Sequence, residues 1–203
     1  DIMDECQRLL LIYLENGNDD DYKILLEFIS KNNIDTDFHM LRDFIHLISS
    51  ISNNHHRNSD FIKRIEKVLT NFQENVKQNI SNLQIFNIFK ENLLILKFLF
   101  EQEVLHFDDT LLKLVIYDEE FEHIRFFFQQ ELKSIISDND YLKLQMKMVE
   151  SDKNVFQNFE EKRNIGENDS YICSLIRNDS IDEFIIHVNK TNYNLKSKIP
   201  QSF

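Results

Sequence analysis

The feature that most constrains the fold is a run of residues, 82–105, in which apolar side chains recur on almost every side of a helix. Polar residues such as Gln84, Asn87 and Glu91 leave only a narrow hydrophilic stripe. A helix that is apolar nearly all round belongs in a protein interior. The polar interruptions are too frequent for a membrane span, which needs about 20 apolar residues. We therefore expect residues 82–105 to form the core helix of an all-helical domain, with Ser81 and Gln84 as its capping box.

The rest of the chain alternates helical periodicity with short polar turns. Apolar residues recur every three or four positions in seven further segments, which we expect to be helices: about 1–15, 20–31, 36–52, 60–80, 111–117, 118–136 and 141–163. The chain has only two glycines and one proline, so it contains few helix breakers. The sequence predicts an all-α fold of antiparallel helical hairpins, stacked as an irregular bundle or solenoid. The polar loop at 52–59 is the expected internal joint.

Several helix ends are marked by local signals. Asn16-Gly17 is expected to stop the first helix, because glycine accepts the left-handed conformation that often ends helices. Asp109 or Thr110 is the expected N-cap of the helix at 111–117.

The C-terminal segment has the content of a helix–turn–helix unit. Apolar residues fit a short helix ending near Ile176 and a second beginning at Ile181, with Ser180 and Glu183 as a capping box. The string GENDSYICSLIRNDSIDEFIIHVNK, with NIFKENLLILKFLF and KIPQSF, resembles the trichomonad-type ankyrin-repeat proteins, although the Thr-Pro-Leu-His signature is absent.

That resemblance implies an architecture and no chemistry. In the family, a helical N-terminal domain leads into an ankyrin array. By this likeness, residues 1–163 are a helical N-terminal domain and residues 164–203 are an ankyrin-like helix pair, the start of a truncated repeat array. Regular repeats would then lie beyond Phe203 or be missing. The family pattern carries no catalytic residue over to this chain.

The net charge of −12 is concentrated in two segments. Residues 1–22 carry seven acids and one base, and residues 101–122 carry eight acids and one base. Nucleic acid and anionic membranes are bound mainly through clustered Lys and Arg, so we expect neither nucleic-acid binding nor membrane insertion. A solvated surface is the ordinary interpretation of such segments, and a docking patch for a protein partner is the alternative. The candidate interaction surface comprises Asp19, Asp20, Asp21, Asp118, Glu119, Glu120, Lys63, Arg64 and Lys67.

One group of residues has the spacing of metal ligands. His39, Asp43 and His46 stand at i, i+4 and i+7, so they could share a helix face and support a metal-dependent hydrolase. Any amphipathic helix offers the same spacing on its polar face, and no fourth ligand stands nearby in the sequence. We therefore expect no metal, no cofactor and no catalytic site.

The two cysteines, Cys6 and Cys173, lie far apart and outside any CxxC pattern, which favours buried thiols in a reducing cytoplasm. No leader or transmembrane segment is visible in the sequence. The function expected from these patterns is a non-catalytic protein–protein interaction or scaffold domain, which precedes or caps ankyrin-type repeats. The alternative is a structural component of a cytoskeletal or ciliary assembly, in which case the protein would be cytoskeleton-associated.

Overall fold

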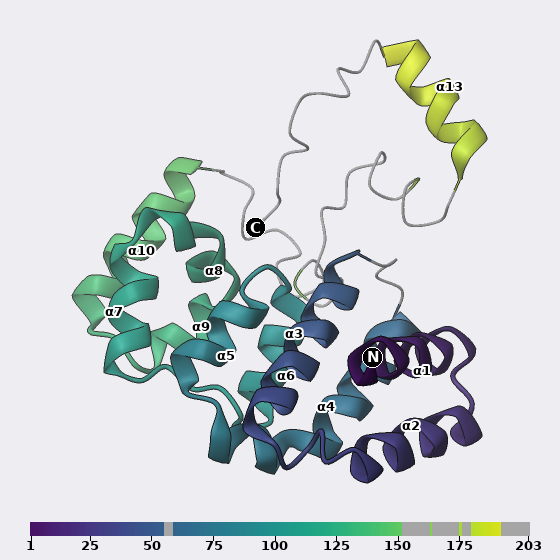
Figure 1. The fold of residues 1–203 in the computed structure, drawn as a ribbon. Helices are drawn as coiled ribbons and strands as arrows, with labels where there is room; N and C mark the ends of the chain where they lie inside the picture. The colour runs from purple at the N-terminus through teal and green to yellow at the C-terminus, as the bar shows by residue number, and fades with distance from the viewer. Residues whose placement is uncertain (55–58, 152–162, 164–174, 176–179, 192–203) are drawn as a thin grey trace. The chain divides into compact units, whose positions relative to one another are not determined.

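A computed structural model describes residues 1–54, 59–151, 163, 175 and 180–191 of the chain. Within these residues every regular element is a helix, as the periodicity predicts (Figure 1). Contacts divide the chain into two compact units, Asp1–Leu111 and Leu112–Phe203. The expected joint at 52–59 lies inside the first unit, where α3 ends at Asn54 and α4 begins at Ser59. The expected boundary at 163/164 is flanked by residues outside the described part of the chain, so it stays a prediction.

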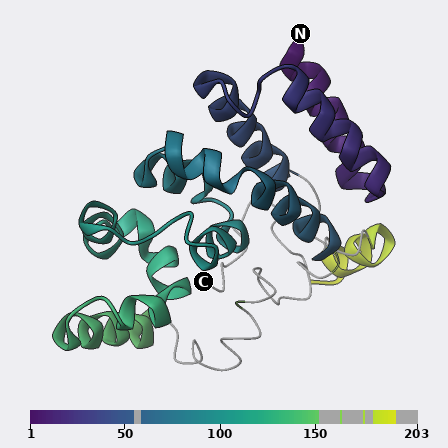
Figure 2. The same cartoon turned by 90° about the horizontal axis from the view of Figure 1, so that it is seen from below.

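The first unit contains six helices along the described chain. They are α1 (Ile2–Asn16), α2 (Asp19–Lys31), α3 (Phe38–Asn54), α4 (Ser59–Asn79), α5 (Asn82–Phe89) and α6 (Leu93–Glu101). The helix α1 packs beside α2, and α4 contacts α1, α3 and α6 (Figures 1 and 2). The centre of this unit is therefore α4, whose apolar stripe is buried along its length. This differs from the expectation that residues 82–105 would be the central element.

The predicted single helix at 82–105 is wrong, because the structure breaks it between α5 and α6. In a continuous helix the Ile88 carbonyl would accept from the N–H of residue 92. The Asn92 N–H instead donates to the Phe89 carbonyl at 2.8 Å. The released Ile88 carbonyl accepts a hydrogen bond from the Ser49 hydroxyl of α3 at 2.5 Å. A buried polar contact thus replaces the helical hydrogen bond.

The side chain of Asn92 completes the break. It is 0% exposed, and its Oδ1 accepts from the Ile95 N–H at 3.2 Å, which caps α6. Its Nδ2 donates to the Ser52 carbonyl at 3.3 Å, near the end of α3. A buried side-chain amide needs an acceptor for its nitrogen and a donor for its oxygen, and Asn92 has both.

The second unit begins within α7 (Asp109–Tyr117). Its further described elements are η1 (Glu119–Phe121), α8 (Glu122–Phe127), α9 (Gln129–Lys133), α10 (Asp138–Ser151) and α13 (Ile181–Thr191). The predicted helix at 118–136 is thus divided at Phe128, which separates α8 from α9. Three consecutive phenylalanines at 126–128 are buried. Because consecutive helical residues point about 100° apart, one regular helix would not bury all three on a single face.

Most other predicted ends are close to those observed. Gly17 has φ 72° and ends α1, as Asn16-Gly17 indicates. Ser81 and Gln84 form the predicted capping box of α5. The N-cap of α7 was misassigned, because Asp108 accepts from the N–H groups of Thr110 and Leu111 at 3.1 and 2.8 Å.

Two further predictions fall partly outside the described residues. The helix expected at 141–163 begins earlier, at Asp138, and is described to Ser151. Of the expected ankyrin-like pair, α13 lies where the second helix was expected, and of the first helix only Leu175, which is buried, falls within the described residues. Cys6 is buried, and burial raises the pKa of its thiol to about 12, while Cys173 lies outside the described part.

Candidate interaction surfaces

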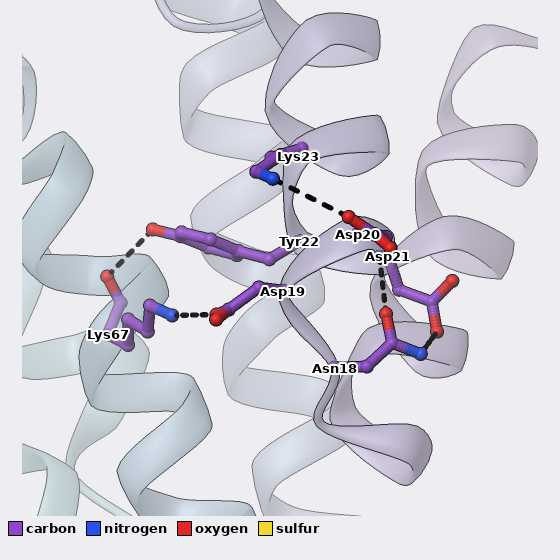
Figure 3. Close-up of polar contacts among 7 residues, drawn as sticks. All are labelled: Asn18, Asp19, Asp20, Asp21, Tyr22, Lys23 and Lys67. Carbon is purple, nitrogen blue, oxygen red and sulfur yellow. Dashed lines mark hydrogen bonds and ion pairs between the residues drawn. The ribbon is translucent and has the colours of Figure 1, made fainter.

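The acidic and basic parts of the predicted interaction surface meet in the first unit. Asp19, in the first turn of α2, accepts an ion-paired hydrogen bond from Lys67 Nζ of α4 at 2.9 Å (Figure 3). This bond lowers the pKa of the Asp19 carboxyl and raises the pKa of the Lys67 amine. Both side chains are largely solvent-exposed, so the pair contributes little to stability. Its consequence is that the two charges neutralise each other.

Lys67 is also held by a tyrosine. Its Nζ lies 4.4 Å from the centroid of the Tyr22 ring, a cation–π geometry. The Tyr22 hydroxyl donates to the Lys67 carbonyl at 3.3 Å, as Figure 3 shows. The Tyr22 ring lies 4.8 Å from that of Tyr13 on α1. Lys67 therefore joins α4 to α2 and is not a solvated lysine awaiting a partner.

The other two acids in the first turn of α2, Asp20 and Asp21, act near the N-terminus of the helix. Asn18 caps the helix by accepting from the Asp21 N–H at 2.7 Å, and its own Nδ2 donates to the Asp21 carboxylate at 2.6 Å (Figure 3). Asn16 donates to the same carboxylate at 3.0 Å. Asp20 pairs with Lys23 at 3.5 Å. Negative charge here also complements the helix dipole, so helix formation accounts for both acids.

Arg64 has a structural position that periodicity did not reveal. Its Nη1 donates to the carbonyls of Leu14 and Glu15, at 2.6 and 2.9 Å. These carbonyls belong to the C-terminal end of α1, whose last turn has no basic residue. The guanidinium also covers Gly17, where an added Cβ would lie 2.4 Å from Arg64 Cζ. Arg64 thus caps the C-terminal end of α1 from α4. Its neighbour Lys63 is exposed.

Asp118, Glu119 and Glu120 are exposed in the second unit. Asp118 caps η1 by accepting from the Glu120 N–H at 3.0 Å. The Asp118 carbonyl accepts from Nη1 of Arg125 at 2.5 Å, and the same nitrogen donates to the Val115 carbonyl at 2.8 Å. The exposed carboxylates therefore surround the C-terminal end of α7, which a buried arginine caps from α8.

Arg125 is a residue that sequence reasoning missed. It is 6% exposed, and burial lowers the pKa of its guanidinium, although the carboxylates of Glu122, Asp118 and Glu119 oppose that change. Arg125 follows Ile124 and precedes Phe126 in an apolar pattern, where an arginine reads as an exposed interruption. No local signal distinguishes a buried capping arginine from a solvated one.

Arg163 is likewise buried, although its neighbours in sequence suggest a basic patch. It forms an ion pair with Glu131 of α9 and is 3% exposed. Its Cζ lies 5.1 Å from the Phe127 ring centroid and 5.8 Å from that of Phe128.

The metal hypothesis has no geometric support in α3. Within the described part of the chain, no group of three or more His, Cys, Asp or Glu side chains is arranged to hold a metal ion. Instead, the Asp43 carboxylate lies 3.8 Å from Nη2 of Arg42. The His39 ring contacts the Phe38 ring, and the two ring centroids are 5.3 Å apart. His39, Asp43 and His46 are thus not brought together as ligands.

The surface that sequence reasoning did not identify is on α13. Ile181, Ile185 and Ile186 are 61%, 51% and 51% exposed, and no residue of this helix is buried. The periodicity indicates an amphipathic helix here, and we expected its apolar side to pack within an ankyrin-like pair. The amphipathic periodicity of α13 was therefore evident in the sequence, but it did not show whether the apolar side of the helix is buried or exposed.

Comparison with models of protein families, with curated proteins and with solved structures found no match to this chain. None of the helices in the described ranges has both the length and the apolar character needed to cross a membrane.

Proposed function

We propose that this chain is a non-catalytic protein-interaction domain that acts as a cytoplasmic scaffold and precedes or caps ankyrin-type repeats. The observation that carries the binding role is the exposed apolar side of α13, with three isoleucines at least half exposed. Exposed apolar surface of this kind typically marks a site where another molecule binds.

The charged residues support the same proposal. Asp19, Lys67, Arg64 and Asp118 are engaged as caps and ion pairs of the fold. Their geometry explains them as structural residues, so recognition is better assigned to the apolar side of α13. Rim charges would then add salt dependence to binding without dominating it.

A pull-down with the full chain tests this role. The bait is incubated with an extract of the cells that produce it, and bound proteins are eluted in steps of rising salt and identified by mass spectrometry. The test variant is Ile181→Ser/Ile185→Ser/Ile186→Ser. We expect it to lose the proteins that the native chain retains, because the apolar contact is removed.

The matched control is Ile2→Ser/Ile24→Ser, which changes isoleucines that are 44% and 50% exposed in the first unit. It should retain the partners. Retention that is equal for all three baits, or absent from all three, would argue against a binding role for α13.

A further inference from the structure

We infer that α13 binds α13 of a second copy of this chain, as an antiparallel helix pair about a two-fold axis. This inference rests on the proposed function, because it names the partner of the same apolar surface. It follows from the order of side chains around α13, from their exposure and from the placement of two charges.

The exposed side of α13 is symmetric in sequence about its middle. At 100° per residue, Asp182 and Asn189 lie on one line along the helix, with Ile185 and Ile186 about 50° to either side of it. All four of these residues are exposed. We call this surface the α13 face.

Antiparallel pairing about a point between Ile185 and Ile186 makes the α13 face complementary to itself. Ile185 contacts Ile185 of the second copy, and Ile186 contacts Ile186 of the second copy. Asp182 comes opposite Asn189 of the second copy, where the amide can donate to the carboxylate. An interface in which one patch pairs with itself is the closed arrangement that gives dimers and not filaments.

Two charges at the edge of the α13 face complete the match. Glu183 and Lys190 lie on the same edge, near opposite ends of the helix, and both are exposed. Antiparallel pairing brings Glu183 of each copy beside Lys190 of the other, which gives two equivalent ion pairs. Parallel pairing would place these edges of the two copies on opposite sides of the pair, so neither ion pair would form, and the charges favour the antiparallel orientation.

The size of the surface sets the expected affinity. An 11-residue helix is about 16 Å long. A pair of such helices buries less than the roughly 1,200 Å² of a small specific interface. Self-association should therefore be weak and reversible, and it should be measured at high protein concentration.

A charge-exchange experiment on the purified full chain tests the pairing, with sedimentation equilibrium as the measurement. The native chain should form dimers. Glu183→Lys and Lys190→Glu should each weaken dimerisation about tenfold or more, because each places like charges together twice. An equimolar mixture of the two variants should dimerise again, since the mixed dimer has one ion pair with its native residues and one ion pair with both charges exchanged.

Lys113→Glu is the control, because it makes the same charge change as Lys190→Glu on an exposed lysine of α7, and it should dimerise as the native chain does. Circular dichroism should show unchanged helicity in every variant, since α13 buries none of its residues. A native chain that stays monomeric, or a mixture that fails to dimerise, overturns the inference. Those results leave the pull-down outcome unaffected, so failure of self-association is distinguishable from failure of the proposed function.

Discussion

At the residue scale, two arginines perform the same task in different units. Arg64 donates to carbonyls at the end of α1, and Arg125 donates to carbonyls at the end of α7. Neither receiving helix has a basic residue in its last turn. The unpaired carbonyls of a helix C-terminus carry partial negative charge, so an arginine from elsewhere supplies both the donor and the positive charge.

Replacing Gly17 with alanine should destabilise the first unit through two effects. An alanine at φ 72° costs about 1–2 kcal/mol in backbone strain. Its Cβ would also displace the Arg64 guanidinium from the α1 carbonyls. We expect Gly17→Ala to lower the urea concentration at the midpoint of unfolding. Circular dichroism would monitor the unfolding.

A double-mutant cycle separates these effects. In an Arg64→Ala background the steric conflict is absent, so Gly17→Ala should cost less free energy of unfolding there than in the native chain. An equal cost in both backgrounds would mean that the guanidinium does not rest against Gly17.

Which residues could be predicted depends on the range of their contacts. The stop at Gly17 and the capping box of Ser81 and Gln84 were predicted correctly, because both are decided within a few residues. The Asp19–Lys67 pair joins residues 48 positions apart, and nothing in the local sequence indicates it. Charge counting therefore named both residues as candidates, but it did not indicate the ion pair between them.

At the element scale, the break between α5 and α6 shows tertiary contact overriding periodicity. Residues 82–101 have the pattern of one helix, and only the buried Ser49 hydroxyl and Asn92 amide explain the interruption. An asparagine inside an apolar run is ambiguous, since it can lie on an exposed stripe or act as a buried cap. Position alone does not decide between the two.

Asn92→Ala should therefore destabilise the protein by about 1–3 kcal/mol, because the Ile95 N–H loses its cap and the buried Ser52 carbonyl loses a donor. Urea denaturation followed by circular dichroism would measure the loss. The matched control is Asn87→Ala, an exposed asparagine of α5, which should change stability by less than about 0.5 kcal/mol. Similar midpoints for the two variants would contradict the buried cap.

At the scale of the whole molecule, the division into two units was not evident from the sequence. It falls within α7, between Leu111 and Leu112, where the residues are apolar and helical. Sequence reasoning expected an internal joint in the polar loop at 52–59, because joints usually lie in such loops, and took the domain boundary at 163/164 from the family resemblance. Contacts between distant residues, and not local composition, define the two units.

Hydrogen exchange should report the two units separately. Arg125→Met removes the donors to the Val115 and Asp118 carbonyls, which lie in the second unit. We expect faster amide exchange in α7 and α8 by mass spectrometry, with α1 to α4 unchanged, because compact units open independently. Asn92→Ala is the reciprocal variant and should accelerate exchange in α5 and α6. Uniform acceleration by either variant would show that the chain opens as one cooperative body.

The contact between Gly17 and Arg64 also has a meaning for how this chain can evolve. A side chain at position 17 either displaces the Arg64 guanidinium or requires a smaller residue at position 64, and both changes leave the end of α1 without its donor. Neither position can drift alone without cost. In descendants of this sequence we expect the two to be inherited as a pair, with a change at one followed by a change at the other and by a new cap for α1.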